Sequence, residues 1–151
     1  MAVGLSKSAG AGGPGISSIP DVEGFRGFIP ERVFDAYCEG STWRSLVDEG
    51  VGSFGLDRKT AELALDMELE RLSVANEPAL ICEAEAMLRQ FTSRDRKLDE
   101  KEKSDIIQLV CKAKPGYAKG LRHEVANSFI IDFCRQNGVK VKVGLFKWAV
   151  P

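Results

Sequence analysis

The chain has 151 residues, of which 44% are hydrophobic and 28% are charged, and its formal net charge at neutral pH is −1. These proportions are typical of a globular protein long enough to bury a core, and they argue against a chain that is disordered throughout. No apolar run approaches the roughly 18 residues that a membrane-spanning helix needs. We therefore expect a cytoplasmic protein with no membrane partner.

The N-terminal segment is rich in Gly, Ser, Ala and Pro, a composition typical of flexible chain. It has one lysine and no continuous apolar stretch, which argues against a secretory signal. The sequence therefore predicts three parts: a flexible leader at 1–22, a helical domain at 23–138, and a strand-like basic and aromatic tail at 139–151.

Two short helices are predicted after the leader. Pro30 suits the first position of a helix, and a helix over 29–39 gains an apolar side from Phe34 among others. Ser41 is a suitable N-cap for a second helix, and Gly50 is a suitable end.

The next two helices have clearer patterns. Asp57 is predicted to cap a helix over 58–73 whose leucines recur at helical spacing. Asn76 is predicted to cap a fourth helix, with Pro78 in its first turn and Phe91 near its end.

The charged stretch that follows, residues 92–106, has two interpretations. Carboxylates at 95, 99, 100, 102 and 105 suggest a calcium loop, but that loop also needs a central Gly and a Glu in its twelfth position. Counted from Asp95, those positions hold Glu100 and Ile106. Asp99 and Glu102 instead have the spacing of a capping box, so we predict the start of a fifth helix.

The chain is predicted to end in a helix over 118–136, stopped at Gly138, and then a strand over 139–148. Valine and lysine alternate along the strand, and Gly144 suits a bulge or bend. The fold class is therefore mainly α, a compact bundle of five to six helices with a C-terminal β-strand, which becomes a two-stranded ribbon if the strand finds a partner.

An isolated strand is unstable in water, so this one needs a partner. Three partners are open: the N-terminal segment Gly24–Ile29 (GFRGFI), the same strand of a second copy, or another protein. The last two make the tail an interface. Its partner-binding residues are then Val139, Val141, Val143, Phe146 and Trp148.

Charge is unevenly distributed along the chain. Residues 1–108 hold 13 basic and 20 acidic side chains, whereas residues 109–151 hold 8 and 2. Basic residues near aromatic ones can bind single-stranded nucleic acid, and lysines also protect edge strands from aggregation. The candidate anion or nucleic-acid contacts are Lys119, Arg122, Lys140, Lys142 and Lys147.

The sequence contains no recognisable catalytic or metal-binding pattern, so we expect no enzyme, no cofactor and no metal. The four cysteines form no CxxC pair, and His123 is the single histidine. Cys82, Cys111 and Cys134 fall on apolar helical faces and are predicted to be buried free thiols. Acidic side chains such as Glu68, three residues before Arg71, are predicted to form solvated salt bridges.

Part of the chain resembles the TerB-like family of helical domains, which is associated with tellurite resistance and stress systems. The resemblance spans Glu77 to about Phe133: a helix ending in AEAMLRQF, a charged turn, the acidic helix start LDEKEKSDII, and a further amphipathic helix. It implies an all-α cytosolic domain.

Together these features predict a non-enzymatic helical module for protein–protein interaction, an adaptor or assembly subunit, with the C-terminal strand as its interface. Its partner is then another protein or a second copy in an oligomer. The alternative is a nucleic-acid-binding protein that uses the basic C-terminal quarter.

Overall fold

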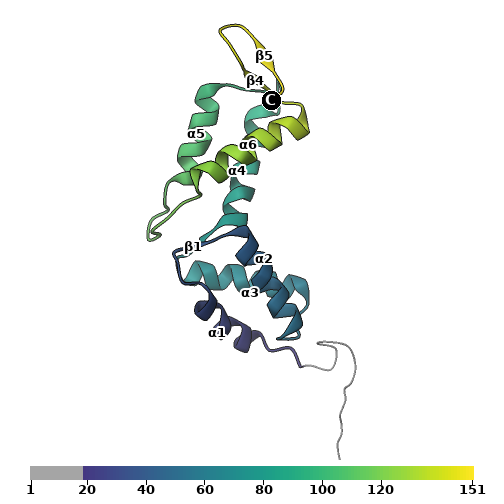
Figure 1. The fold of residues 1–151 in the computed structure, drawn as a ribbon, viewed down its shortest axis with the longest axis vertical. Helices are drawn as coiled ribbons and strands as arrows, with labels where there is room; N and C mark the ends of the chain where they lie inside the picture. The colour runs from purple at the N-terminus through teal and green to yellow at the C-terminus, as the bar shows by residue number, and fades with distance from the viewer. Residues whose placement is uncertain (1–18) are drawn as a thin grey trace, which may run out of the picture. The chain divides into compact units, whose positions relative to one another are not determined.

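The computed structural model describes residues 19–151, and that part of the chain is mainly α-helical, with six helices and five short strands (Figure 1). The predicted fold class is confirmed. Contacts divide the chain into two compact units, which we call unit 1 (to Asn76) and unit 2 (from Glu77). The helical domain expected at 23–138 thus extends over both. Most of the expected leader lies outside the described residues, and Val22 already begins a helix.

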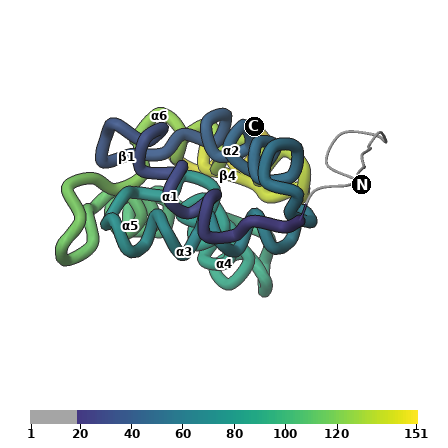
Figure 2. The backbone as a smooth tube through the Cα atoms, turned by 90° about the horizontal axis from the view of Figure 1, so that it is seen from below, coloured from purple at the N-terminus to yellow at the C-terminus, as the bar shows by residue number. Residues whose placement is uncertain are grey.

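Unit 1 is built from three helices and two short strands. They are α1 (Val22–Arg32), β1 (Tyr37–Cys38), α2 (Gly40–Gly52), α3 (Arg58–Arg71) and β2 (Ala75–Asn76). The backbone can be followed from α1 through β1 in Figure 2. The strands pair in parallel, with Tyr37 opposite Ala75. This pairing joins the connection after α1 to the connection after α3.

The helix predicted over 29–39 is wrong, because α1 ends at Arg32. The Asp21 side chain caps its start, accepting from the Gly24 N–H at 2.8 Å. Phe25 and Ile29 lie one turn apart and are fully buried, so the apolar face of α1 is centred on them. Pro30 lies in the last turn rather than the first. Burial of this apolar pair therefore outweighs the preference of proline for a helix start.

The N-cap predicted at Ser41 is also wrong, while the one at Asp57 is confirmed. Helix α2 starts at Gly40, and its cap residue Glu39 makes no side-chain capping bond. The Asp57 carboxylate accepts from the Thr60 N–H at 2.9 Å at the start of α3. That hydrogen bond favours the ionised carboxylate and lowers the pKa of Asp57.

Unit 2 contains the other three helices and a small sheet. Its elements are α4 (Glu77–Thr92), β3 (Lys97–Leu98), α5 (Glu100–Cys111), α6 (His123–Asn137), β4 (Lys140–Lys142) and β5 (Trp148–Ala149). Strand β4 lies between the other two, parallel to β3 and antiparallel to β5. The core of unit 2 includes Leu88, Ile106 and Ile130, one from each of its three helices.

The turn between α4 and α5 confirms the predicted capping box. The Asp99 carboxylate accepts from the Glu102 N–H at 2.7 Å, and the Glu102 carboxylate accepts from the Asp99 N–H at 3.1 Å. The Asp95 carboxylate accepts from the Lys97 N–H. These three carboxylates therefore bind the backbone of their own turn, as the helix-start interpretation requires.

Replacing Asp99 by Ala is expected to lower the free energy of unfolding by about 1 kcal/mol, because α5 loses its side-chain cap. Urea unfolding followed by Trp148 fluorescence in a Trp43→Phe background would report this loss, since Trp148 lies in unit 2. Ser104→Ala, an exposed change in the interior of the same helix, is the control. Equal stability of the two variants would contradict the capping role.

The last helix begins later than predicted, at His123, and ends as predicted at Gly138, whose φ of 63° is left-handed. Leu121, expected within the helix, lies in the preceding loop. It is buried there, and its N–H donates to the Val110 carbonyl at 2.8 Å. The loop is thus fixed to the end of α5 before α6 starts.

The single strand predicted over 139–148 is wrong, because these residues form a hairpin. The chain bends at Gly144–Phe146, and the two strands pair with each other. The suggested partner Gly24–Ile29 is part of α1 instead. The strand therefore finds its partners, β3 and β5, within unit 2.

Candidate interaction surface

The tip of the C-terminal hairpin presents large apolar side chains to solvent. The Val143 N–H donates to the Lys147 carbonyl at 2.9 Å, which closes the turn between them. Within this turn, Leu145 is 80% exposed and Phe146 is 92% exposed. The turn extends away from α5 and α6 (Figure 1). We call Val143–Lys147 the hairpin tip.

The base of the hairpin is fixed to the rest of unit 2. The Lys140 N–H donates to the Arg96 carbonyl at 2.9 Å, so β4 is bonded to the turn before β3. The Lys97 ammonium lies 5.1 Å from the centre of the Trp148 ring, a cation–π distance. The Arg135 guanidinium donates to the Pro151 carbonyl at 3.1 Å. The tip is therefore held on an anchored base.

The five predicted partner-binding residues have different positions in the hairpin. Val139 is buried in the core of unit 2, and Val141 and Trp148 are partly buried at the base. Val143 and Phe146 are exposed at the tip. The structure thus leaves two of the five predicted residues exposed to a partner.

Leu145 was missed as a surface residue of this site. In a continuous strand, the period of two that gathers Val139, Val141 and Val143 would place Leu145 on the same face. The bend that starts at Gly144 breaks that period, so Leu145 and Phe146 both lie at the tip. Gly144 was the available signal, because glycine within a strand pattern often marks a bend.

The predicted basic residues do not form one surface. Lys140, Lys142 and Lys147 belong to the hairpin and are exposed. Lys119 and Arg122 belong to the loop between α5 and α6, at the opposite end of these helices (Figure 1). A nucleic-acid strand that lies along the hairpin would therefore contact three of the five predicted basic residues.

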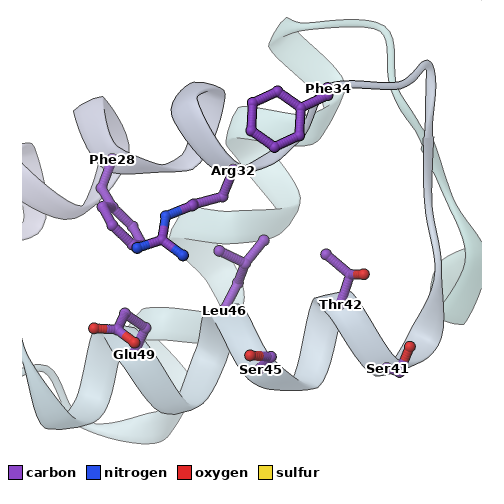
Figure 3. A pocket seen from close by; sticks show the side chains of 8 residues that line it. All are labelled: Phe28, Arg32, Phe34, Ser41, Thr42, Ser45, Leu46 and Glu49. Atoms are coloured by element: carbon purple, nitrogen blue, oxygen red, sulfur yellow. The ribbon is translucent and has the colours of Figure 1, made fainter.

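Unit 1 carries a hollow between α1 and α2 (Figure 3), with a volume of about 310 Å³. Its lining residues are Phe28, Arg32, Phe34, Ser41, Thr42, Ser45, Leu46 and Glu49. The Arg32 guanidinium lies 4.6 Å from the centre of the Phe28 ring. Phe34, on the segment after α1, is 91% exposed. The sequence had placed Phe34 on the apolar side of a helix, so this hollow was not predicted.

The structure places the cysteines of unit 2 and the single histidine on three helices, α4, α5 and α6. Burial raises the pKa of the Cys111 and Cys134 thiols, which keeps both protonated at neutral pH. Cys82 is exposed, which corrects its predicted burial, and His123 is exposed at the start of α6. Within residues 19–151, no three or more His, Cys, Asp or Glu side chains are grouped to hold a metal ion. No helix in that range is long and apolar enough to cross a bilayer.

Comparisons of this chain with protein-family models, with curated proteins and with solved structures found no match. The resemblance of residues 77–133 to the TerB-like family stays a prediction. The candidate sites are therefore identified from the geometry of each unit alone. They are the exposed hairpin tip in unit 2 and, separately, the hollow in unit 1.

Proposed function

We propose that this chain is a non-enzymatic helical module for protein–protein interaction or assembly, with the hairpin tip as its interface. The observation that carries the proposal is the exposure of Leu145 and Phe146, adjacent in sequence, on a turn with an anchored base. Aromatic side chains are enriched at binding surfaces, and a few of them supply most of the binding energy.

The anchored base matters for affinity as well as for position. Ordering a mobile loop on binding costs about 0.5–1.5 kcal/mol for each side chain that becomes fixed. Hydrogen bonds from Lys140 to the turn before β3 and from Arg135 to Pro151 already order the base of the hairpin. A partner would thus meet a largely preformed surface. Two exposed lysines, Lys142 next to the tip and Lys147 at its end, favour an acidic partner surface.

Replacing Leu145 and Phe146 together by Ser is expected to leave the fold intact and to abolish partner binding. Both side chains are largely exposed, so their removal costs little core packing. Circular dichroism and thermal unfolding check the fold. Affinity purification of the tagged protein from its source cells, followed by mass spectrometry, checks the partner. Leu109→Ser, which replaces another exposed apolar side chain, on α5, is the control and should retain the partner.

The double substitution is a sharper test than removal of residues 139–151. That deletion also removes Val139, which is buried, and β4, which bonds to β3, so it would destabilise unit 2. The proposal would be contradicted if the wild type and the variant with Ser at Leu145 and Phe146, the tip variant, purified with the same proteins in the same amounts. Nucleic-acid binding that falls steeply with salt and is unchanged in the tip variant would favour the alternative function.

A further inference from the structure

We infer that the partner of the hairpin tip is a second copy of this chain, whose unit 1 hollow receives the tip. This inference rests on the proposed function and names its partner. It joins two surface features that the proposed function alone does not connect. One is the exposed pair Leu145 and Phe146 in unit 2, and the other is the hollow beside exposed Phe34 in unit 1.

The hollow suits an aromatic side chain in size and lining. Its volume is about 310 Å³, and an apolar cavity of about 150 Å³ can hold a benzene ring. Phe28 and Leu46 provide apolar walls, and Phe34 stands at its edge (Figure 3). An incoming Phe146 could pack against the Phe34 ring, and such aromatic pairs add about 0.5–1.5 kcal/mol beyond the buried area.

The polar part of the hollow suits the backbone of a turn. Ser41, Thr42 and Ser45 lie along the α2 side of the hollow (Figure 3). Their hydroxyl groups can both donate and accept hydrogen bonds. The tip residues Gly144–Phe146 are not part of a strand, so their backbone groups need such partners when water is removed.

Charge favours this pairing over contact between two hairpins. Residues 28–49 carry five acidic and two basic side chains, of which Glu49 and Arg32 line the hollow itself, whereas residues 140–151 carry three lysines and no acid. Opposite charges steer association and fix orientation, and like charges facing each other are unfavourable. Two hairpins meeting tip to tip would place lysines against lysines. The predicted pairing of the strand with the same strand of a second copy is therefore disfavoured.

The contact joins two different surfaces, the tip of one copy and the hollow of another. Two copies that exchange tips form a closed pair, whereas a pair joined through one contact keeps one unused tip and one unused hollow. In the second case association continues into rings or chains as concentration rises. One turn in one hollow buries a small area, which is typical of weak and transient contacts.

The test is sedimentation of the full-length protein over a wide concentration range, with Phe146→Ser and Phe34→Ser measured separately and mixed. The wild-type average mass should rise with concentration. Each variant alone should associate at least about tenfold more weakly, because each has lost one half of the contact. An equimolar mixture should recover dimers and nothing larger, because it contains one intact hollow–tip pair. Leu63→Ser and Leu109→Ser, exposed changes in units 1 and 2, should behave as wild type.

Three results would overturn the inference: a wild type that is monomeric at every concentration, a Phe34→Ser variant that associates normally, or a mixture that does not recover dimers. Failure of the inference can be told apart from failure of the proposed function. If the wild type is monomeric but the Leu145 and Phe146 double variant no longer binds a different protein that the wild type binds, the inference alone is wrong. If the double variant keeps both its self-association and its binding to other proteins, the inference and the proposed function are both wrong.

Discussion

Replacing Glu68 by Gln is expected to lower the free energy of unfolding of unit 1 by about 1.5–3 kcal/mol at neutral pH, the range for hydrogen bonds to charged groups. The Glu68 side chain is 3% exposed. Its carboxylate accepts from Arg71 Nε at 2.9 Å and lies 3.5 Å from Arg26 Nε. Gln has nearly the same shape but no charge, so both guanidinium groups would face a neutral amide.

The measurement is urea unfolding followed by Trp43 fluorescence in a Trp148→Phe background, so that the signal comes from unit 1. Glu70→Gln is the matched control, because it makes the same change of charge at an exposed position on the same helix. An exposed substitution of this kind is expected to change stability by less than about 0.5 kcal/mol. If the two variants lost similar amounts of unfolding free energy, the effect would come from the change in net charge and not from the buried position of Glu68.

The difference between wild type and Glu68→Gln should also depend on pH. Hydrogen bonding from Arg71 is the largest cause that lowers the pKa of Glu68 below its usual value of 4.5, and it outweighs burial. A carboxyl group with a lowered folded-state pKa stabilises the fold fully above its unfolded-state pKa. That contribution is lost as pH falls through the folded-state value. The difference should therefore be constant near neutral pH and shrink below about pH 4.5; a constant difference down to full protonation would contradict the ion-pair explanation.

Glu68 also shows what the sequence could not supply. Its position three residues before Arg71 predicted an ordinary solvated pair, since that spacing is common on exposed helix faces. In the structure, Arg26 from α1 comes close to the same carboxylate, and α1 itself was placed elsewhere in the sequence by the preference of Pro30. Burial of a charged side chain depends on which helix packs over it, and local spacing does not contain that information.

The parts predicted correctly are those with local physical causes. Asp57 and Asp99 cap helices through bonds that span three residues, and Gly138 ends α6 with a left-handed backbone. The mainly α fold follows from such signals together with helical periodicity.

The candidate site was only partly predictable, because its causes are not local in the sequence. The valine and lysine alternation identified the tail, but the bend at Gly144 turned one strand into two and exposed Leu145. The hollow needed two helices side by side, α1 and α2, and the first of these was predicted in the wrong place.

Gly50 is the residue at which a local signal was most misleading. Glycine often follows the last residue of a helix, so it was predicted to end the helix that became α2. It instead lies inside α2, which continues to Gly52, and it is buried. A Cβ atom at this position would lie 2.9 Å from Phe25 Cζ and 3.0 Å from Ala61 Cβ. The glycine therefore permits close packing of α2 against α1 and α3.

Replacing Gly50 by Ala is accordingly expected to lower the stability of unit 1, although alanine is the better helix former. The gain in helix propensity is at most about 1 kcal/mol. Forcing a methyl group into a filled core costs about 1–3 kcal/mol. Phe25 and Ala61 are fully buried, and the Phe25 ring also packs against Phe54, so neither can move away easily. A net loss of up to about 2 kcal/mol is expected.

Gly52→Ala is the matched control, because it makes the same change at the exposed end of the same helix, where no atom lies within 4 Å of the added Cβ. This variant should be neutral or more stable by up to about 0.5 kcal/mol, since only helix propensity changes. Urea unfolding with Trp43 as the probe measures both variants. Opposite signs at Gly50 and Gly52 would establish close packing at Gly50, because both variants gain the same methyl group and differ in what surrounds it. Stabilisation at both positions would mean that α2 has room for a side chain there, and that the contact of α2 with Phe25 and Ala61 is looser than the structure has it.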